Sequence, residues 1–177
     1  MARENKNISP VMAIGVWILV FALSSYLLSY KFNDDDVNPN KHIHVDNFKS
    51  SATERSITLK LNKYSQYVLS GKINNHRVDF ILDTGATHVA IPQRIAKQAG
   101  LKPGTKYEVS TANGDIYAYL SKIDKLQFGN ITLSNVNAMI MPDNEDDEGY
   151  ILLGMSALKK LEFTHTNGKL RITQYKK

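Results

Sequence analysis

The chain has 177 residues, which is enough for one ordinary domain with an appendage. Hydrophobic residues make up 42% and charged residues 22%, a balance that excludes wholesale disorder. The absence of cysteine excludes disulfide frameworks, thiol catalysis and cysteine-bound zinc. The net charge of +5 comes from scattered basic residues rather than from a basic stripe, so we expect no nucleic-acid partner.

Residues 11–30 form an uncharged apolar run of twenty residues, VMAIGVWILVFALSSYLLSY. At a rise of about 1.5 Å per residue, a helix of this length spans the hydrocarbon core of a bilayer. A cleaved signal peptide is the alternative, but its apolar region is usually about 7–15 residues long. The sequence Ser24-Ser25-Tyr26 is also a poor cleavage site. We therefore expect a transmembrane anchor at 11–30.

The basic residues on the two sides of this anchor are nearly balanced, so they do not decide its orientation. A short tail, residues 1–10, precedes a much larger C-terminal part. This asymmetry favours a cytoplasmic tail and an external domain. For a bacterium, the expectation is a single-pass inner-membrane protein with a periplasmic domain.

Residues 31–55 contain Asp34-Asp35-Asp36, Pro39, several Asn and Ser, and few apolar side chains. This composition predicts a flexible tether that has nothing to pack against. His42 and His44 lie two residues apart in this segment. A metal site would need further ligands at fixed spacing, and none is evident, so we interpret them as solvated histidines.

The remaining residues, 56–177, show the period-two alternation of β-strands, beginning with Ile57, Leu59 and Leu61. Turn signals such as Asn74-Asn75 and Asn167-Gly168 separate the apolar runs. Two stretches, 92–100 and 155–161, are expected to be short helices. The pattern predicts a mostly β domain of about 120 residues. The expected strands are 57–61, 67–73, 78–82, 107–110, 116–121, 125–128, 131–133, 136–141 and 151–153.

An apolar strand, residues 78–82, runs directly into Asp83-Thr84-Gly85-Ala86-Thr87. Such a turn displays a carboxylate, while the glycine permits a tight fold and the hydroxyls can bond neighbouring main-chain groups. An ordinary surface turn uses the same residue types, so the triplet Asp-Thr-Gly alone is weak evidence.

A second motif lies at residues 110–114, Ser-Thr-Ala-Asn-Gly. Alternating runs flank Asn113-Gly114, the strongest short hairpin signal available. A hairpin of this kind can fold over a bound peptide and offer it main-chain hydrogen bonds. Without a catalytic motif nearby, it would simply be a β-hairpin.

Together with Ile151-Leu152-Leu153-Gly154 about seventy residues later, these motifs resemble the retropepsin-like aspartic proteases, specifically the bacterial membrane-anchored kind with a single Asp-Thr-Gly. The resemblance implies a single acid-protease β-barrel with one or two short helices after the transmembrane helix. It places the catalytic carboxylate on Asp83, and it places a flap that binds substrate on Thr111, Ala112, Asn113 and Gly114. It places the support of the catalytic loop on Thr84, Gly85, Ala86, Thr87 and Gly154.

The resemblance further implies an endopeptidase that acts on peptide or protein substrates without cofactor or metal. Two carboxyl groups in contact share one proton, so that one activates water while the other polarises the scissile carbonyl. Since this chain has one Asp-Thr-Gly, the second carboxylate is expected from an identical chain in a homodimer. Viral relatives usually follow the later Gly with Arg and then Asn or Asp. Here Met155-Ser156 follows, so the details of the viral subunit contact do not transfer.

Other interpretations are weaker. A phosphate-binding loop of the actin and sugar-kinase type needs several hundred residues and a second glycine-rich loop. The acidic stretch 143–149 resembles a calcium loop in charge, but its Gly falls one place late, which favours a solvated loop. His88 has no role in aspartic chemistry and is expected to be structural or at the rim. A catalytically inactive module that binds peptides or dimerises stays open as the alternative to the enzyme.

Overall fold

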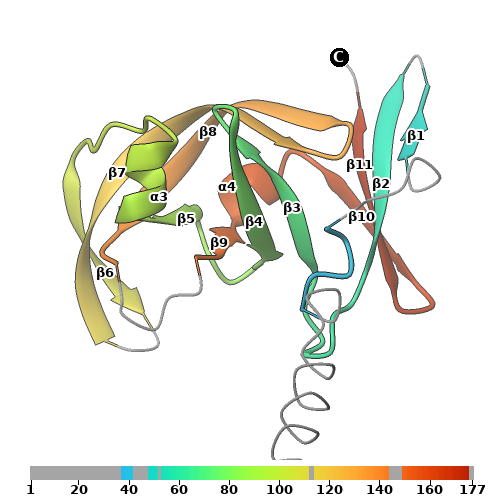
Figure 1. Ribbon diagram of the computed structural model, residues 1–177, viewed down its shortest axis with the longest axis horizontal. Coiled ribbons are helices and arrows are strands. Elements are labelled where there is room, and N and C mark those ends of the chain that lie inside the picture. Colours follow the sequence, from blue (N-terminus) through green and yellow to red (C-terminus); the bar gives the residue numbers. More distant parts are fainter. Residues whose placement is uncertain (1–36, 42–47, 52, 112–113, 144–148, 176–177) are drawn as a thin grey trace, which may run out of the picture.

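The computed structural model describes residues 37–41, 48–51, 53–111, 114–143 and 149–175. In these ranges the chain forms two β-sheets and two short helices (Figure 1). The mostly β prediction is therefore confirmed. No helix within the described residues is long and apolar enough to cross a membrane, and the anchor expected at 11–30 lies outside them.

The smaller sheet has the strand order β1-β2-β11-β10 and lies on the right in Figure 1. Its strands are β1 (Phe48–Ser50), β2 (Glu54–Lys60), β10 (Glu162–Thr166) and β11 (Lys169–Tyr175). Residues 57 and 59 of β2 are fully buried and residues 58 and 60 are more exposed, as the period of two predicts. Asn167-Gly168 joins β10 to β11 with both φ angles positive, which suits a tight hairpin turn.

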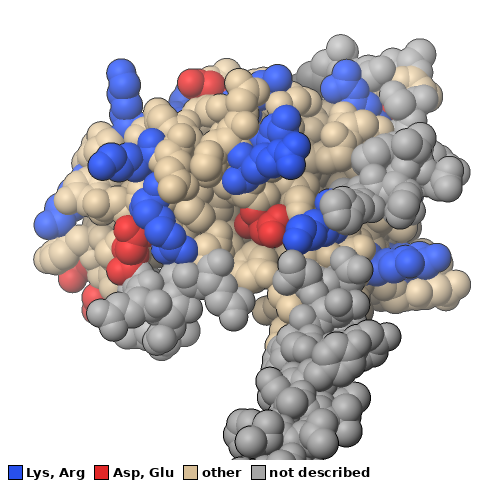
Figure 2. Space-filling view, viewed as in Figure 1, with Lys and Arg blue, Asp and Glu red and all other residues tan. Residues whose placement is uncertain are grey.

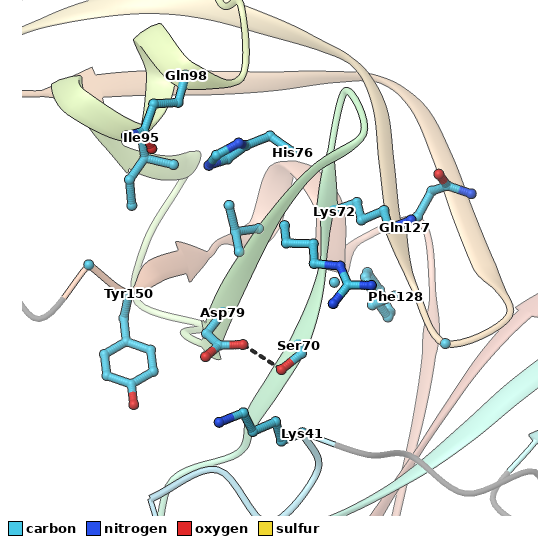
Figure 3. A pocket seen from close by; sticks show the side chains of 15 residues that line it. Lys41, Ser70, Lys72, His76, Asp79, Ile95, Gln98, Gln127, Phe128 and Tyr150 are labelled. Atoms are coloured by element: carbon cyan, nitrogen blue, oxygen red, sulfur yellow. Dashed lines mark hydrogen bonds between the residues drawn. The ribbon is translucent and has the colours of Figure 1, made fainter. Parts of the chain in front are cut away.

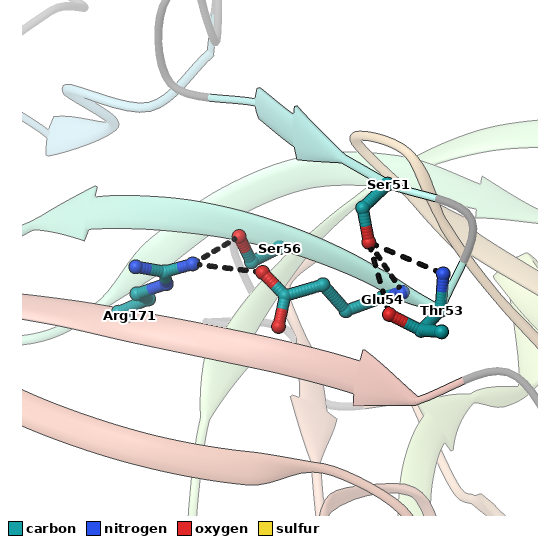
Figure 4. A network of polar contacts seen from close by, with 5 residues as sticks. All are labelled: Ser51, Thr53, Glu54, Ser56 and Arg171. Atoms are coloured by element: carbon teal, nitrogen blue, oxygen red, sulfur yellow. Dashed lines mark hydrogen bonds and ion pairs between the residues drawn. The ribbon is translucent and has the colours of Figure 1, made fainter.

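Polar contacts join the two central strands of this sheet (Figure 4). The Arg171 guanidinium of β11 donates hydrogen bonds to Ser56 Oγ (3.1 Å) and to the Glu54 carboxylate (3.3 Å) of β2. Ser51 Oγ accepts the main-chain N–H of Glu54 at 3.0 Å and shapes the turn from β1 into β2. At the far end of β11, a hydrogen bond to the Glu162 carboxylate raises the pKa of the exposed Tyr175.

The larger sheet has the strand order β3-β4-β9-β5-β8-β7-β6. A further pairing between β3 and β7 closes six of these strands into a barrel and leaves β6 as a flanking strand. Its strands are β3 (Val68–Ile73), β4 (His76–Leu82), β5 (Val89–Pro92), β6 (Lys106–Thr111), β7 (Gly114–Phe128), β8 (Ile131–Met141) and β9 (Ile151–Leu153). One apolar cluster joins the barrel interior to the inner face of the smaller sheet, so the two sheets share a core.

Several sequence expectations differ from these elements. The two runs 116–121 and 125–128 belong to one long strand, β7, and 131–133 and 136–141 belong to β8. The short strand β5 was not predicted, because three of its four residues are buried and show no alternation. The helices are α3 (Gln93–Gln98) and α4 (Met155–Leu158), each shorter than expected.

The expectation that residues 31–55 have nothing to pack against is wrong for the described part of that segment. Asn38 and Asn40 are buried against the barrel, and β1 pairs with β2. The side chains of Asn38 and Asn40 form hydrogen bonds with the domain, which the polar composition of the segment does not reveal. His42 and His44 lie outside the described residues.

Candidate active site

Asp83 lies at the point where β4 ends, beside β9. These two strands run parallel, with Leu82 paired to Leu153. The main-chain N–H of Asp83 donates to the Leu153 carbonyl at 3.2 Å. The chain then turns, and Asp83 Oδ1 accepts the main-chain N–H of Gly85 at 2.8 Å. The half-buried carboxylate is therefore held by the backbone of its own turn.

The residues after β9 hold the other side of this turn, which we call the Asp83 loop (residues 83–87). The main-chain N–H of Met155 donates to the Ala86 carbonyl at 2.8 Å, and that of Ser156 donates to the Thr87 carbonyl at 2.9 Å. The loop thus receives hydrogen bonds from the first turn of α4. The structure brings the five residues of the loop and Gly154 together, as the sequence resemblance implied.

Gly154 is buried where two segments of backbone cross. A Cβ atom at this position would lie 2.2 Å from the His88 carbonyl oxygen and 2.6 Å from that of Ala86. These distances are too short for any side chain, and the atoms are main-chain atoms that cannot rotate away. The close approach of β9 to the Asp83 loop therefore requires glycine.

Ser156 is a part of this site that the sequence reasoning missed. Its buried hydroxyl donates to the Asn137 carbonyl at 2.6 Å and accepts the main-chain N–H of Val89 at 3.1 Å. It therefore joins β8 to the first residue of β5, directly after the Asp83 loop. A single serine at the start of a predicted helix gives no sequence signal for this role.

Two hydroxyl side chains of the loop, Thr84 and Thr87, are exposed in the single chain, as is Gly85. Ala86 and His88 are partly buried. The face of the loop that carries Thr84 is therefore open to a ligand or to a second protein surface.

The expected flap is the hairpin of β6 and β7. Thr111 pairs with Gly114 at its tip, while Ala112 and Asn113 lie outside the described residues. Near the tip, Ser110 Oγ donates to the Asp115 carboxylate at 2.5 Å. Further back, Lys106 Nζ lies 3.9 Å from the centre of the Tyr117 ring. Most of the side chains on this hairpin are exposed, so it projects from the barrel.

A cleft of about 810 Å³ lies elsewhere, on the outer face of the β3–β4 hairpin (Figure 3). It is lined by Ser70, Lys72, Arg77, Asp79 and Tyr150 among others, and none of its lining residues belongs to the Asp83 loop. Figure 2 shows basic side chains spread over this face with acidic ones between them. The cleft and the Asp83 carboxylate are therefore separate features.

Of the acidic stretch 143–149, which resembles a calcium loop in charge, the structure describes only Asp143 and Gly149. Asp143 accepts the main-chain N–H of Arg94 at 3.0 Å and lies 3.6 Å from the guanidinium of the same residue. Residues 144–148 lie outside the described part of the chain. Within that part, no group of three or more His, Asp or Glu side chains is placed to hold a metal ion.

The geometry of the site suits chemistry by a carboxylate. A partly buried Asp on a rigid turn can serve as a general base towards a bound water.

Comparison with known proteins places this site in context. A family model described as "gag-polyprotein putative aspartyl protease" matches residues 69–160, which include both the Asp83 loop and Gly154. A curated relative, an uncharacterized protein in the cobV 5′ region of Sinorhizobium sp, is 27% identical over 115 residues. The match covers 63% of this chain and 48% of the relative, so the chain spans about half the length of that relative.

One solved structure supports the fold. A retropepsin-like aspartic protease from Rickettsia conorii is 23% identical with a TM-score of 0.57, over 72% of this chain and 97% of that one. This likeness shows that the described domain has the retropepsin-like β-barrel fold. The EIAV protease in complex with the inhibitor HBY-793 is 15% identical with a TM-score of 0.44, over 57% of this chain and 92% of that one.

Proposed function

Because the chain belongs to the retropepsin-like aspartyl protease family, we propose that it is an aspartic endopeptidase whose catalytic carboxylate is Asp83. The observation that carries this proposal is the placement of Asp83. It lies on a loop that donates a main-chain hydrogen bond to Leu153 and accepts two from Met155 and Ser156, within the stretch that the family model matches. Such a loop keeps a carboxylate in one position while substrate binds.

The active form is a homodimer with the site on its two-fold axis. One chain contributes one Asp-Thr-Gly, and the chemistry needs both a base and an acid. Two Asp83 carboxyl groups in contact share one proton, because both cannot ionise there. The ionised group takes a proton from water as the water attacks the scissile carbonyl, and the protonated group hydrogen-bonds to that carbonyl oxygen. The exposed Thr84 is then free to support the partner's loop.

The β6–β7 hairpin acts as the flap over an extended peptide. Main-chain groups of this hairpin, which lies at the edge of the larger sheet, can pair with the substrate backbone, as in β-strand addition. The apolar run at 11–30 anchors the enzyme in the bacterial inner membrane by a single span, with the domain in the periplasm.

Hydrolysis of denatured casein by the full chain, between about pH 4 and pH 7, tests the proposal. Asp83→Asn keeps the size of the side chain but removes the base, so we expect hydrolysis to fall to the background rate. Asp79→Asn is the matched control: this carboxylate lies on β4, four residues before Asp83, and accepts a hydrogen bond from Ser70, so we expect turnover to persist. Pepstatin should inhibit the wild-type chain.

The result also separates the enzyme from its alternative. A wild-type chain that binds casein peptides but cleaves none would be an inactive peptide-binding module. Cleavage that persists at the wild-type rate in Asp83→Asn would contradict the assignment of the catalytic residue.

A further inference from the structure

Three buried asparagines hold the chain where it enters the folded domain. Asn38, Asn40 and Asn62, which we call the asparagine clamp, are 3%, 5% and 8% exposed. Asn40 alone satisfies three main-chain groups. Its Nδ2 donates to the carbonyls of Lys60 (3.0 Å) and Val68 (2.6 Å), and its Oδ1 accepts the Lys60 N–H (2.9 Å). The entering segment is thereby fixed between the end of β2 and the start of β3.

The other two asparagines extend this attachment. Asn38 Nδ2 donates to Ser70 Oγ at 3.1 Å, and Ser70 in turn donates to Asp79, as Figure 3 shows. Asn62 Nδ2 donates to the Val37 carbonyl at 3.0 Å. The first described residue of the chain is therefore bonded to the loop between β2 and β3.

That loop, residues 61–66, is held by hydrogen bonds to the Asn62 side chain and exposes Leu61 and Tyr64. Asn62 Oδ1 accepts the main-chain N–H groups of Tyr64 and Gln66, each at 2.9 Å. Tyr64 is 59% exposed and Leu61 is 38% exposed, while Lys63 Nζ lies 5.2 Å from the centre of the Tyr64 ring. A tyrosine with a leucine and a lysine beside it matches the preference of the membrane–water interface.

The Asp83 loop lies along the same edge of the domain. Val68, which binds the clamp, pairs with Ile81, and the Tyr67 carbonyl accepts the N–H of Leu82 at 3.0 Å. Leu82 directly precedes Asp83. In Figure 1 the segment 37–41, the turn between β2 and β3 and the end of β4 all lie along the lower side, and the C-terminus lies at the top.

The apolar run ends at Tyr30, and six residues, 31–36, separate it from the clamped Val37. Even a fully extended chain of six residues reaches only about 20 Å. The clamp fixes Val37 to the domain, so only residues 31–36 can act as a tether. If residues 11–30 lie in a bilayer, the clamped edge of the domain must therefore lie within about 20 Å of the bilayer surface.

We infer that the edge formed by the clamp and loop 61–66 faces the bilayer surface and holds the neighbouring Asp83 loop close to it, and that the substrates are extended segments of membrane-inserted proteins close to where they leave the bilayer. This inference rests on the membrane-anchored protease proposed above. The anchor keeps the domain close to the membrane, and the clamp fixes which edge of the domain faces the membrane.

The first experiment measures the orientation without using activity. The chain has no cysteine, so single variants Tyr64→Cys and Tyr175→Cys can each carry one environment-sensitive fluorophore. Tyr175 is 54% exposed and lies at the opposite end of β11, where it pairs with Glu54 while Lys169 pairs with Lys60. In full-length protein reconstituted into phosphatidylethanolamine and phosphatidylglycerol vesicles, a lipid-borne nitroxide should quench the label at 64 and spare that at 175. Equal quenching, or none at 64, would overturn the inference.

The second experiment measures substrate selection. One casein segment is used in three forms. The first is free in solution; the other two are fused to a transmembrane helix in the same vesicles. A flexible spacer of about 5 residues, spanning roughly 12 Å, gives the near segment, and one of about 60 residues, spanning roughly 43 Å, gives the distant segment. We expect the near segment to be cleaved at least roughly tenfold faster than the distant one. A Gly/Ser insertion of about 40 residues between Asp36 and Val37 should remove this preference and leave the rate on the soluble segment unchanged.

The outcomes separate the two proposals. Equal cleavage of near and distant segments contradicts the membrane-proximal substrate class and leaves the protease assignment intact. If no form of the segment is cleaved, the protease assignment fails, while the quenching experiment still decides whether this edge faces the bilayer.

Discussion

The Asp83 loop and the β6–β7 hairpin are both parts of the larger sheet, yet they are held in different ways. The loop donates a main-chain hydrogen bond to β9 and accepts two from α4, and the missing side chain of Gly154 lets the backbone of these segments come close to the loop. The hairpin consists of the flanking strand β6 and the first residues of β7, and most of its side chains are exposed.

The difference matches the two tasks proposed for these regions. A catalytic carboxylate must stay within a fraction of an ångström of its working position, so its loop is fixed by atoms that cannot rotate away. A flap must open and close around a peptide, so it is drawn from the less stable part of the structure. Substitutions at the Asp83 loop should therefore mainly lower the free energy of unfolding, whereas substitutions in the hairpin should mainly weaken substrate binding.

The largest effect is expected at Gly154. In Gly154→Ala, the new methyl group would overlap the His88 and Ala86 carbonyls, so the loop must move. We expect a loss of about 3 kcal/mol in the free energy of unfolding, with loss of activity. Urea unfolding followed by circular dichroism measures the first, and casein hydrolysis measures the second.

Gly114→Ala at the tip of the hairpin is the matched control. Gly114 has a φ of +110°, which strains any other residue, but among the described residues no atom beyond its chain neighbours lies within 4 Å of the added methyl group. We expect a loss of about 1 kcal/mol from backbone strain alone. Equal losses in the two variants would mean that the hairpin is as firmly built into the core as the Asp83 loop.

The sequence predicted much of this fold and one half of the site. Alternating strands such as β2, and turns with the residues that favour positive φ, such as Asn74-Asn75, were visible as patterns. The likeness of Asp-Thr-Gly and the later Leu-Leu-Gly to a known family suggested that residues 83 and 154 meet. No periodicity or spacing could show this, because the contact depends on a parallel pairing between distant strands.

The parts that sequence reasoning missed share a physical cause. β5 is buried on both faces, so it lacks the alternation that marks a half-buried strand. The asparagine clamp and Ser156 act through side-chain bonds to main-chain atoms far along the chain. Asparagine and serine occur both in solvated tethers and at buried positions where their side chains bind main-chain atoms. The sequence alone therefore does not distinguish the two environments.

A smaller effect is expected from Ser156→Ala. This change leaves the buried N–H of Val89 and the Asn137 carbonyl without their hydroxyl partner. We expect a loss of about 2 kcal/mol in the free energy of unfolding. Ser121→Ala is the control, because the hydroxyl of Ser121 bonds the Lys102 carbonyl at an exposed position. A loss in Ser121→Ala as large as that in Ser156→Ala would contradict the bracing role of Ser156.

The smallest effect on stability is expected in the hairpin itself, at Ser110. Its hydroxyl donates to the Asp115 carboxylate across the hairpin, and both residues are exposed, so water can replace the bond when it is lost. We expect Ser110→Ala to change the free energy of unfolding by less than about 0.5 kcal/mol. The same bond orders the hairpin next to its tip. Its loss should therefore raise KM for casein peptides by roughly twofold to fivefold, which corresponds to a hydrogen bond of about 0.5–1 kcal/mol. We expect kcat to be nearly unchanged. Steady-state kinetics measures both constants. A fall in kcat with an unchanged KM would place Ser110 in the chemistry rather than in the flap, and a stability loss as large as that of Ser156→Ala would remove the distinction between the fixed loop and the exposed hairpin.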